Sequence, residues 1–298
     1  MREWGNGERP PTWLGVWGGE FAPTGCMGRP YFSAVTRRAT SSTRGDERVL
    51  DLVHGAERVP ASLLLPRGEA GAPAVLLLHG FSSNKERMVQ SVGRALQQRG
   101  VASLALDLPF HGERHGPEAE LPYRNPIALV TAWRSAVREA RSAIEWLGGQ
   151  PEIDGARLGL LGYSLGGFLA LMTASEEEAV RVITLAAAGD LPDSTPYLAL
   201  LRRAVDPLRA VRRLDGRPLL LVNGRRDTTT RPAQAERLFA RAEEPKELYW
   251  YEGGHWPPVS AIEYAAEWTT RQLRGDAEMR GWGDAEPQRR RGGARGER

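Results

Sequence analysis

The sequence is poor in cysteine and in lysine, and it contains no long apolar run. Cys26 is the only cysteine among the 298 residues, which excludes an internal disulfide and a metal site built from several cysteines. No stretch reaches the roughly 18 apolar residues that a membrane-spanning helix needs, so we expect no membrane partner. The N-terminal residues also lack the apolar core of a secretory signal. Together these absences predict a reducing, cytoplasmic location.

The basic side chains give little indication of a nucleic-acid partner. The formal net charge is +3, and lysine occurs only at Lys85 and Lys246, so almost every cation is an arginine. These arginines are scattered among acidic residues rather than forming one stripe with interleaved aromatic side chains. Hydrophobic residues make up 41% and charged residues 26% of the chain, as in ordinary globular proteins. We therefore expect a small-molecule substrate and no nucleic acid, and the sequence defines no oligomeric state.

Three regions of different character divide the chain. Residues 1–44 carry many Gly, Pro, Ser and Thr residues without a regular apolar period, so we expect a poorly ordered N-terminal extension. Residues 275–298 form a polar, arginine-rich tail, which is typical of a disordered and solvated end. The intervening residues 45–274 are long enough to form one domain with a large core.

Continuous apolar runs alternate with amphipathic stretches through the central region. The sequence predicts a leading antiparallel pair of strands over 48–53 and 58–66. The further predicted strands cover 73–80, 101–107, 157–161, 180–189, 217–224 and 246–254, and the predicted helices cover 85–100, 125–149, 168–172, 232–242 and 261–273. Apolar strands that alternate with helices are typical of a mostly parallel sheet covered by helices on both faces. The predicted fold class is therefore α/β.

The segment Gly162-Tyr163-Ser164-Leu165-Gly166 joins a predicted strand to a predicted helix. A turn this tight brings the residues two before and two after the serine into contact, so only glycine fits at those two positions. Ser164 is then held in a strained conformation with its hydroxyl above the edge of the sheet. The alternative is a glycine-rich turn whose serine only caps the helix, and the pattern alone does not exclude it.

Reactive groups in a doubly covered parallel sheet gather beyond the carboxyl ends of the strands. Ser164, Asp227 and His255 each follow a predicted strand, in the order serine, acid, histidine. A serine hydroxyl becomes a good nucleophile when an imidazole removes its proton and a carboxylate orients that imidazole. Of the five histidines, only His255 lies beyond both the serine and the acid. Asp190, which follows the preceding strand, remains an alternative acid.

The central region resembles the α/β-hydrolase superfamily, in particular its dienelactone hydrolase-like and prolyl-oligopeptidase-like esterases. The resemblance rests on the segments HGFSSNK, LDLPFHGERHG and IDGARLGLLGYSLGG, and it covers the whole of residues 45–274. It implies an α/β-hydrolase fold in which Ser164 is the nucleophile, Asp227 the acid and His255 the base.

The same resemblance assigns backbone roles beside the nucleophile. It implies an oxyanion hole formed by the N–H groups of Phe81 and Leu165, and these positions need no particular side chain. It also implies a structural turn near the site that includes His79, Gly80, Gly162 and Gly166.

The segment HGERHG raises the question of a metal site, because it carries His111, Glu113 and His115. In the zinc-protease helix pattern a glutamate directly follows the first histidine, whereas Glu113 stands two residues after His111. The family resemblance instead explains Asp107, His111 and Gly112 as a structural turn, and we expect no metal. The glycines of HGFSS lack the following lysine of a phosphate loop, and we expect no cofactor.

These interpretations predict a serine hydrolase that cleaves carboxylic esters through an acyl-enzyme intermediate. Dienelactone hydrolases proper use a cysteine nucleophile, whereas this chain has Ser164, so we expect an ordinary ester as substrate. The segment between the strands at 180–189 and 217–224 is too short for a large lid, so we expect little or none. Open access for water favours hydrolysis over acyl transfer. The alternatives are a peptidase, a thioesterase, an acyltransferase or a non-catalytic binding protein of the same fold.

Overall fold

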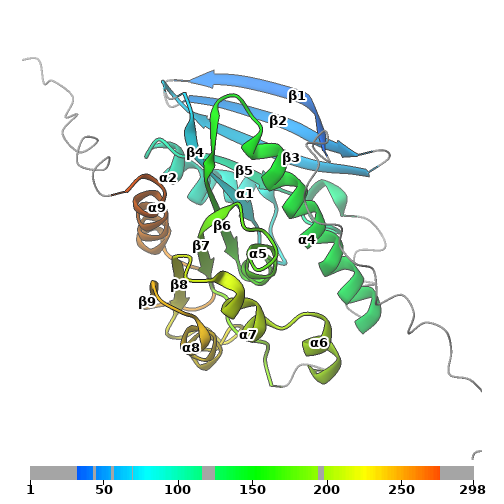
Figure 1. Ribbon diagram of the computed structural model, residues 1–298, viewed down its shortest axis with the longest axis vertical. Helices are drawn as coiled ribbons and strands as arrows, with labels where there is room; N and C mark the ends of the chain where they lie inside the picture. The colour runs from blue at the N-terminus through cyan, green and yellow to red at the C-terminus, as the bar shows by residue number, and fades with distance from the viewer. Residues whose placement is uncertain are drawn as a thin grey trace, which may run out of the picture.

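One sheet of nine strands runs through the part of the chain that the computed structural model describes, residues 32–42, 45–54, 57–68, 70–115, 125–193 and 198–275 (Figure 1). The strands are β1 (Ser33–Ser42), β2 (Gly45–His54), β3 (Glu57–Pro66), β4 (Ala72–Leu78), β5 (Ala102–Leu106), β6 (Ile153–Tyr163), β7 (Val180–Ala186), β8 (Leu219–Gly224) and β9 (Lys246–Tyr251). Their order in the sheet is β1-β2-β3-β5-β4-β6-β7-β8-β9. The pairs from β1 to β5 are antiparallel, and those from β5 to β9 are parallel. The predicted α/β class is confirmed.

Helices cover both faces of the parallel strands. The helical segments are α1 (Lys85–Met88), the π-helical η2 (Val89–Gly93), α2 (Arg94–Gln97), the short 3-10 turn η3 (Gly112–Arg114), α4 (Pro126–Gly148), α5 (Leu165–Ala174), α6 (Leu198–Ala204), α7 (Pro207–Ala210), the 3-10 turn η4 (Val211–Leu214), α8 (Pro232–Arg241) and α9 (Val259–Arg274). Figure 1 shows α2 and α9 on one side of the parallel strands and α4 and α5 on the other. Because successive strand residues point to opposite faces, Leu160 belongs to the core beneath α4 and α5, whereas Leu161 belongs to the core beneath α2 and α9.

Several predicted elements lie where the sequence indicates them. β2 and β3 form the predicted antiparallel pair. α4 begins after Asn125, whose side-chain oxygen accepts a hydrogen bond from the N–H of Ile127 over 2.9 Å, and Pro126 occupies its first turn. α4 ends at Gly148, as predicted. Within the described ranges, no helix is both long enough and apolar enough to cross a membrane.

The N-terminal edge of the sheet differs from the sequence-based expectation. The sequence predicts no regular element within residues 1–44, and this is wrong for Ser33–Ser42, which form β1. All ten residues of β1 are exposed, so no alternation of apolar and polar residues marks the strand. Its backbone hydrogen bonds with β2 stabilise the strand instead. The predictions for residues 1–31, which include Cys26, and for residues 276–298 lie outside the described part of the chain.

The helix predicted over residues 85–100 is present, but its middle is π-helical. Residues 85–97 form α1, η2 and α2 in succession. Gly100 ends the segment with a φ of 71°, a left-handed conformation that suits glycine.

Candidate active site

The turn between β6 and α5 holds Ser164 in a backbone conformation that few side chains adopt. Its φ is 52° and its ψ is −115°, a sparsely populated region in which proteins store strain at functional sites. A Cβ atom at Gly162 would lie 2.2 Å from the carbonyl oxygen of Gly166, and one at Gly166 would lie 2.1 Å from that of Leu78. Both positions therefore require glycine. At Gly162 the clash is with Gly166, as the sequence indicates, whereas at Gly166 it is with the backbone at the end of β4.

Three side chains from different strand ends meet at this turn. The Nε2 atom of His255 lies 2.9 Å from Ser164 Oγ, and its Nδ1 atom lies 2.8 Å from Asp227 Oδ2. The Asp227 side chain is fully buried and that of His255 is 17% exposed. Since an ionised carboxylate only accepts hydrogen bonds, Nδ1 carries the proton, and Nε2 is left to accept from the Ser164 hydroxyl. The structure thus brings together the serine, the acid and the histidine named from the sequence.

Two backbone N–H groups hold the second oxygen of the Asp227 carboxylate. The N–H groups of Thr229 and Thr230 donate to Asp227 Oδ1 over 2.8 and 3.0 Å. The peptide N–H of Asp227 donates to the carbonyl oxygen of Gly224 over 3.2 Å, which closes a tight turn after β8. Because both carboxylate oxygens have partners, the side chain is fixed in one orientation toward His255.

Tyrosine hydroxyls hold the loop that carries His255, a feature that the sequence analysis missed. Tyr251, the last residue of β9, donates to the carbonyl oxygens of Gly254 and His255 over 3.0 and 3.3 Å. Tyr163 donates to the same His255 oxygen over 3.3 Å, and its ring centroid lies 5.4 Å from that of the imidazole. Burial raises the pKa of both tyrosine hydroxyls, so each remains a donor. The aromatic pattern of β9 indicates only a strand, because these contacts depend on the path of the following loop.

The loop after β4 passes directly beside the nucleophile turn. A Cβ atom at Gly80 would lie 2.7 Å from the Tyr163 ring and 3.3 Å from the Ser164 Cβ atom, so this close approach requires glycine. Phe81 follows in this loop. Leu165 is the first residue of α5, where the N–H groups have no carbonyl partner within their own helix. The two positions named for the oxyanion hole therefore belong to the segments that flank Ser164.

Buried His79 connects this loop to the loop after β5. Its Nδ1–H donates to the carbonyl oxygen of Gly80 over 2.7 Å, and its Nε2 accepts from the N–H of Leu108 over 3.0 Å. The ring of His111 lies edge-on to His79, with centroids 5.3 Å apart. Burial disfavours the charged imidazolium and lowers the pKa of His79 to about 4. A neutral histidine thus fixes the backbone immediately before Phe81.

An ion cluster around buried Lys85 involves Glu113 of the segment HGERHG. Lys85 is fully buried, and its Nζ donates to Asp107 Oδ2 over 2.9 Å and to Glu113 Oε1 over 2.6 Å. Gly112 has a φ of 55°, and a Cβ atom there would lie 2.2 Å from the Asp107 carboxylate. Hydrogen bonding from Arg37 lowers the pKa of Glu113 to about 2. Among the residues that the structure describes, no three His, Cys, Asp or Glu side chains form a group that could hold a metal ion.

Comparisons with known proteins agree with this architecture. A family model described as the alpha/beta hydrolase family matches residues 75–218. The crystal structure of acetyl xylan esterase 1 from Thermoanaerobacterium sp. JW/SL YS485 aligns with a TM-score of 0.64, covering 82% of this chain and 89% of that one at 16% identity. The chain has the α/β-hydrolase fold.

Two curated sequences align with parts of this chain. Uncharacterized protein Rv2307c from Mycobacterium tuberculosis (strain ATCC 25618 / H37Rv) is 29% identical over 182 residues, which are 58% of this chain and 59% of the relative. Thiohydrolase aneE from Aspergillus aculeatus is 31% identical over 117 residues, which are 39% of this chain and 34% of the relative. This chain therefore spans less than two thirds of either relative.

Asp190, the alternative acid, has other partners in this structure. Its Oδ2 atom accepts hydrogen bonds from Arg202 Nη2 over 2.8 Å and from Arg237 Nε over 3.1 Å. The Asp190 side chain is 1% exposed, and these two ion pairs join α6 and α8 to the segment after β7. The carboxylate that contacts His255 is that of Asp227.

A pocket of about 320 Å³ lies beside Ser164, on the face of the sheet that α4 and α5 cover. We call it the Ser164 pocket. Trp133 of α4 and Phe168 of α5 form an aromatic wall, with ring centroids 4.8 Å apart. Leu201 of α6 also lines the pocket. The segment between β7 and β8, predicted to carry no large lid, thus contributes a short helical wall in its described residues.

Proposed function

We propose that this α/β-hydrolase cleaves carboxylic esters through an acyl-enzyme intermediate on Ser164. The observation that carries the proposal is the hydrogen-bonded series Ser164–His255–Asp227, with separations of 2.9 and 2.8 Å. A serine hydroxyl needs such a base to lose its proton at neutral pH, and the base needs a carboxylate to fix its tautomer. The strained φ of Ser164 supports the same role, because strain of this kind concentrates at reactive residues.

His255 acts first as a base and then as an acid. Its Nε2 removes the Ser164 proton while Oγ attacks the ester carbonyl carbon, and Asp227 stabilises the resulting imidazolium. The tetrahedral intermediate collapses when His255 gives this proton to the departing alcohol oxygen, which leaves the acyl group on Ser164. A water molecule then loses a proton to His255 and attacks the acyl carbon, and Ser164 regains its proton as the acid departs.

The backbone N–H groups of Phe81 and Leu165 stabilise the oxyanion in this mechanism. The N–H of Leu165 lies at the N-terminus of α5, where the helix dipole favours negative charge. Such donors act where charge develops in the transition state, and losing one typically costs about 10²–10³ in turnover. His79 is a positioning residue for the Phe81 donor, since it holds the carbonyl oxygen of Gly80.

The lining of the Ser164 pocket favours an ester with an apolar group next to its carbonyl. Trp133 and Phe168 provide an aromatic surface, and the volume of about 320 Å³ is enough for a ring or a short to medium alkyl chain. Thr229, Thr230 and Gln234 add polar side chains to the lining. We therefore expect esters of moderate size rather than polymers as substrates.

A panel of p-nitrophenyl esters from acetate to laurate tests the proposal. We expect release of p-nitrophenol that is fastest for short and medium acyl chains and is lost in Ser164→Ala. Product release that does not exceed the buffer rate would instead support a non-catalytic binding protein. Cleavage of amide analogues at a rate equal to that of the esters would support a peptidase.

Thioester hydrolysis is the second candidate function, and it rests on one observation. The relative aneE carries the name thiohydrolase, and it aligns with 39% of this chain. The triad chemistry is the same for a thioester, because the acyl carbon is attacked in both cases. Comparing kcat/KM for an oxygen ester and a thioester with the same acyl chain separates the two functions. A value more than about tenfold higher for the thioester would favour this second candidate.

A further inference from the structure

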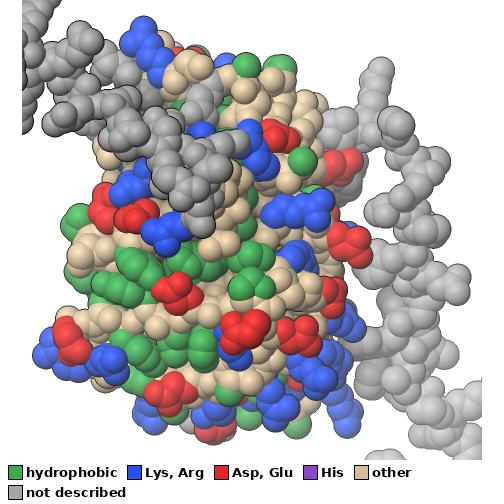
Figure 2. Space-filling view, turned by 60° about the vertical axis from the view of Figure 1, so that its left-hand side comes forward, with side chains coloured by type: hydrophobic (Ala, Val, Ile, Leu, Met, Phe, Trp, Pro, Cys, Tyr) green, Lys and Arg blue, Asp and Glu red, His purple; other side chains and the backbone are tan. Residues whose placement is uncertain are grey.

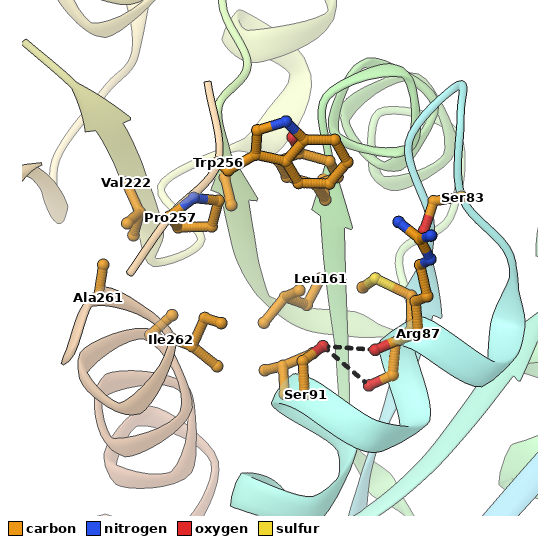
Figure 3. Close-up of a pocket in the computed structure, with 14 residues that line it drawn as sticks. Ser83, Arg87, Ser91, Leu161, Val222, Trp256, Pro257, Ala261 and Ile262 are labelled. Atoms are coloured by element: carbon orange, nitrogen blue, oxygen red, sulfur yellow. Dashed lines mark hydrogen bonds between the residues drawn. The ribbon is translucent and has the colours of Figure 1, made fainter. Parts of the chain in front are cut away.

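A second pocket, of about 200 Å³, lies on the face of the sheet opposite the Ser164 pocket (Figure 3). Its floor includes Leu161 of β6 and Val222 of β8, both of which belong to the core beneath α2 and α9. Figure 3 shows the pocket between the α1–η2 segment on one side and the start of α9 on the other. We call it the α1–α9 pocket.

The body of the α1–α9 pocket is apolar. Met88 of α1 and Ile262 of α9 line it, and Trp256 and Pro257 form the roof. An apolar cavity of about 150 Å³ in a protein can bind benzene. The α1–α9 pocket therefore has room for one ring or a short alkyl chain.

The roof of the pocket is an exposed aromatic side chain. Trp256 is 59% exposed, and its ring stacks on Tyr163 with centroids 5.3 Å apart. Val259, at the start of α9, is 74% exposed. Figure 2 turns the α9 side of the molecule forward and shows hydrophobic side chains gathered between charged ones on this face. Large exposed apolar side chains next to a concave apolar site indicate access for a ligand.

One end of the pocket is polar and carries a cation. Ser83 and Arg87 lie at this end, and Ala261 lies at the other (Figure 3). The Arg87 side chain is exposed, and no carboxylate among the described residues pairs with it. The neighbouring Glu86 pairs with buried Lys85 instead. A guanidinium presents parallel N–H donors that match the two oxygens of a carboxylate.

The π-helical segment η2 contributes to the wall below Arg87. Ser91 and Val92 of η2 line the pocket, and Ser91 Oγ donates to the carbonyl oxygen of Arg87 over 2.7 Å (Figure 3). Short π-helical turns inside α-helices occur frequently at functional sites. Together, the apolar body, the aromatic roof and the cationic end define one chemical class of ligand.

We propose that the α1–α9 pocket binds a small amphipathic monocarboxylate. Its ring or short alkyl chain lies on Leu161 beneath Trp256, and its carboxylate binds the Arg87 guanidinium. This site is separate from Ser164, so the inference goes beyond the proposed esterase activity and does not depend on it.

Calorimetric titration with octanoate tests the ligand class. We expect a Kd of about 0.1–1 mM for octanoate with the wild-type protein. Octanol lacks the charge and octylamine reverses it. The Kd of each should be at least about tenfold higher than that of octanoate. Equal affinity for octanoate and octanol would overturn the carboxylate assignment, and no binding of octanoate would overturn the site.

Three variants test the location. Arg87→Gln should weaken octanoate binding about tenfold and leave octanol binding unchanged, because only the carboxylate contact is lost. Ile262→Trp should weaken both ligands by filling the pocket. Arg212→Gln, at an exposed arginine on η4, is the matched control and should bind octanoate as the wild type does. Octanoate affinity that is unchanged in both Arg87→Gln and Ile262→Trp would show that the ligand binds elsewhere.

Octanoate is also the acid expected from hydrolysis of an octanoyl ester, so it could bind in the Ser164 pocket as a product. The experiment must therefore distinguish binding in the Ser164 pocket from binding in the α1–α9 pocket. Trp133→Ala changes the Ser164 pocket only, and it should leave octanoate binding unchanged. If Trp133→Ala weakens binding while Arg87→Gln does not, the carboxylate binds beside Ser164 and the inference is wrong. Tryptophan fluorescence gives a second readout, since the change on adding octanoate should disappear in Trp256→Phe. Repeating the titration with Ser164→Ala should give the same Kd whether or not the protein proves to be an esterase.

Discussion

The hydroxyl of Tyr251 donates a hydrogen bond to the backbone carbonyl oxygen of His255 over 3.3 Å. The donor ends β9 and the acceptor lies four residues later, so this bond closes the loop back onto its own strand. Tyr163, the last residue of β6, reaches the same oxygen. Two strands therefore fix the backbone of His255, while Asp227 fixes its ring.

Tyr251→Phe should lower kcat for ester hydrolysis by about 3–10-fold and leave KM nearly unchanged. The hydroxyl proton is shared between the carbonyl oxygens of Gly254 and His255, and its hydrogen bonding has a net value of about 1 kcal/mol. Its loss loosens the base without touching the Ser164 pocket. Steady-state kinetics with p-nitrophenyl butyrate measures this difference. Tyr264→Phe is the matched control, because the Tyr264 hydroxyl bonds to Glu247 on the α9 side of the sheet. A similar loss in the control, or a change confined to KM, would contradict the positioning role.

Ser164→Ala should reduce kcat/KM by at least about 10³, as removal of a triad serine does. The fold should survive, because the alanine methyl group fits wherever the serine Cβ atom does. We expect the thermal midpoint to change by no more than about 4 °C. Ser175→Ala, at the end of α5, is a serine control that should retain full activity. Retention of more than about a tenth of the activity in Ser164→Ala would remove Ser164 from the mechanism.

Asp227→Asn should lower kcat by about 10⁴, because an amide leaves His255 in the wrong tautomer. Asp190→Asn should behave differently, since Asp190 pairs with Arg202 and Arg237 and not with His255. For that variant we expect a lower unfolding midpoint and a kcat within about tenfold of wild type. Measuring kcat and thermal unfolding for both variants separates the two acids. A larger loss of kcat in Asp190→Asn than in Asp227→Asn would mean that Asp190, which follows β7, is the acid that pairs with His255.

The residues that meet at the candidate site were accessible to sequence analysis because their constraints are local or topological. Gly162 follows from the tightness of one turn, whereas Gly166 is required because the backbone of Leu78 and His79 passes against it. Parallel strands share a carboxyl edge, so residues after β6, β8 and β9 come together without any knowledge of loop conformation. The partners of Asp190 were not accessible, because they come from helices whose packing no local pattern specifies.

Prediction from the sequence failed for three features, namely β1, η2 and the burial of Lys85. Strand β1 is exposed along its whole length, so its sequence carries no apolar period. The residues of η2 have the composition of an ordinary helix, and the π-helical geometry depends on what packs against it. Lysine is rarely fully buried, yet Lys85 is buried because Asp107 and Glu113 approach it from another loop. The α1–α9 pocket could not be predicted either, because it also depends on how segments distant in the sequence pack together.

His79 should make the protein less stable in acid, over a window set by its two pKa values. Burial holds its folded-state pKa at about 4, below the unfolded value of about 6.5. Between these values the unfolded state binds more protons, so stability falls as pH decreases from about 6.5 to about 4. The loss amounts to about 3 kcal/mol for this one group.

Urea unfolding of wild type and of His79→Gln, measured at intervals from pH 7 to pH 4, tests this assignment. The variant is expected to be less stable at pH 7, because it loses the contacts with Gly80 and Leu108. It should nevertheless show a shallower decline with acidification, since glutamine does not titrate. His115→Gln, at an exposed loop histidine, is the matched control. Parallel declines in wild type and His79→Gln would mean that His79 does not take up its proton on unfolding in this window, and its role as a neutral clamp on the Phe81 loop would be lost.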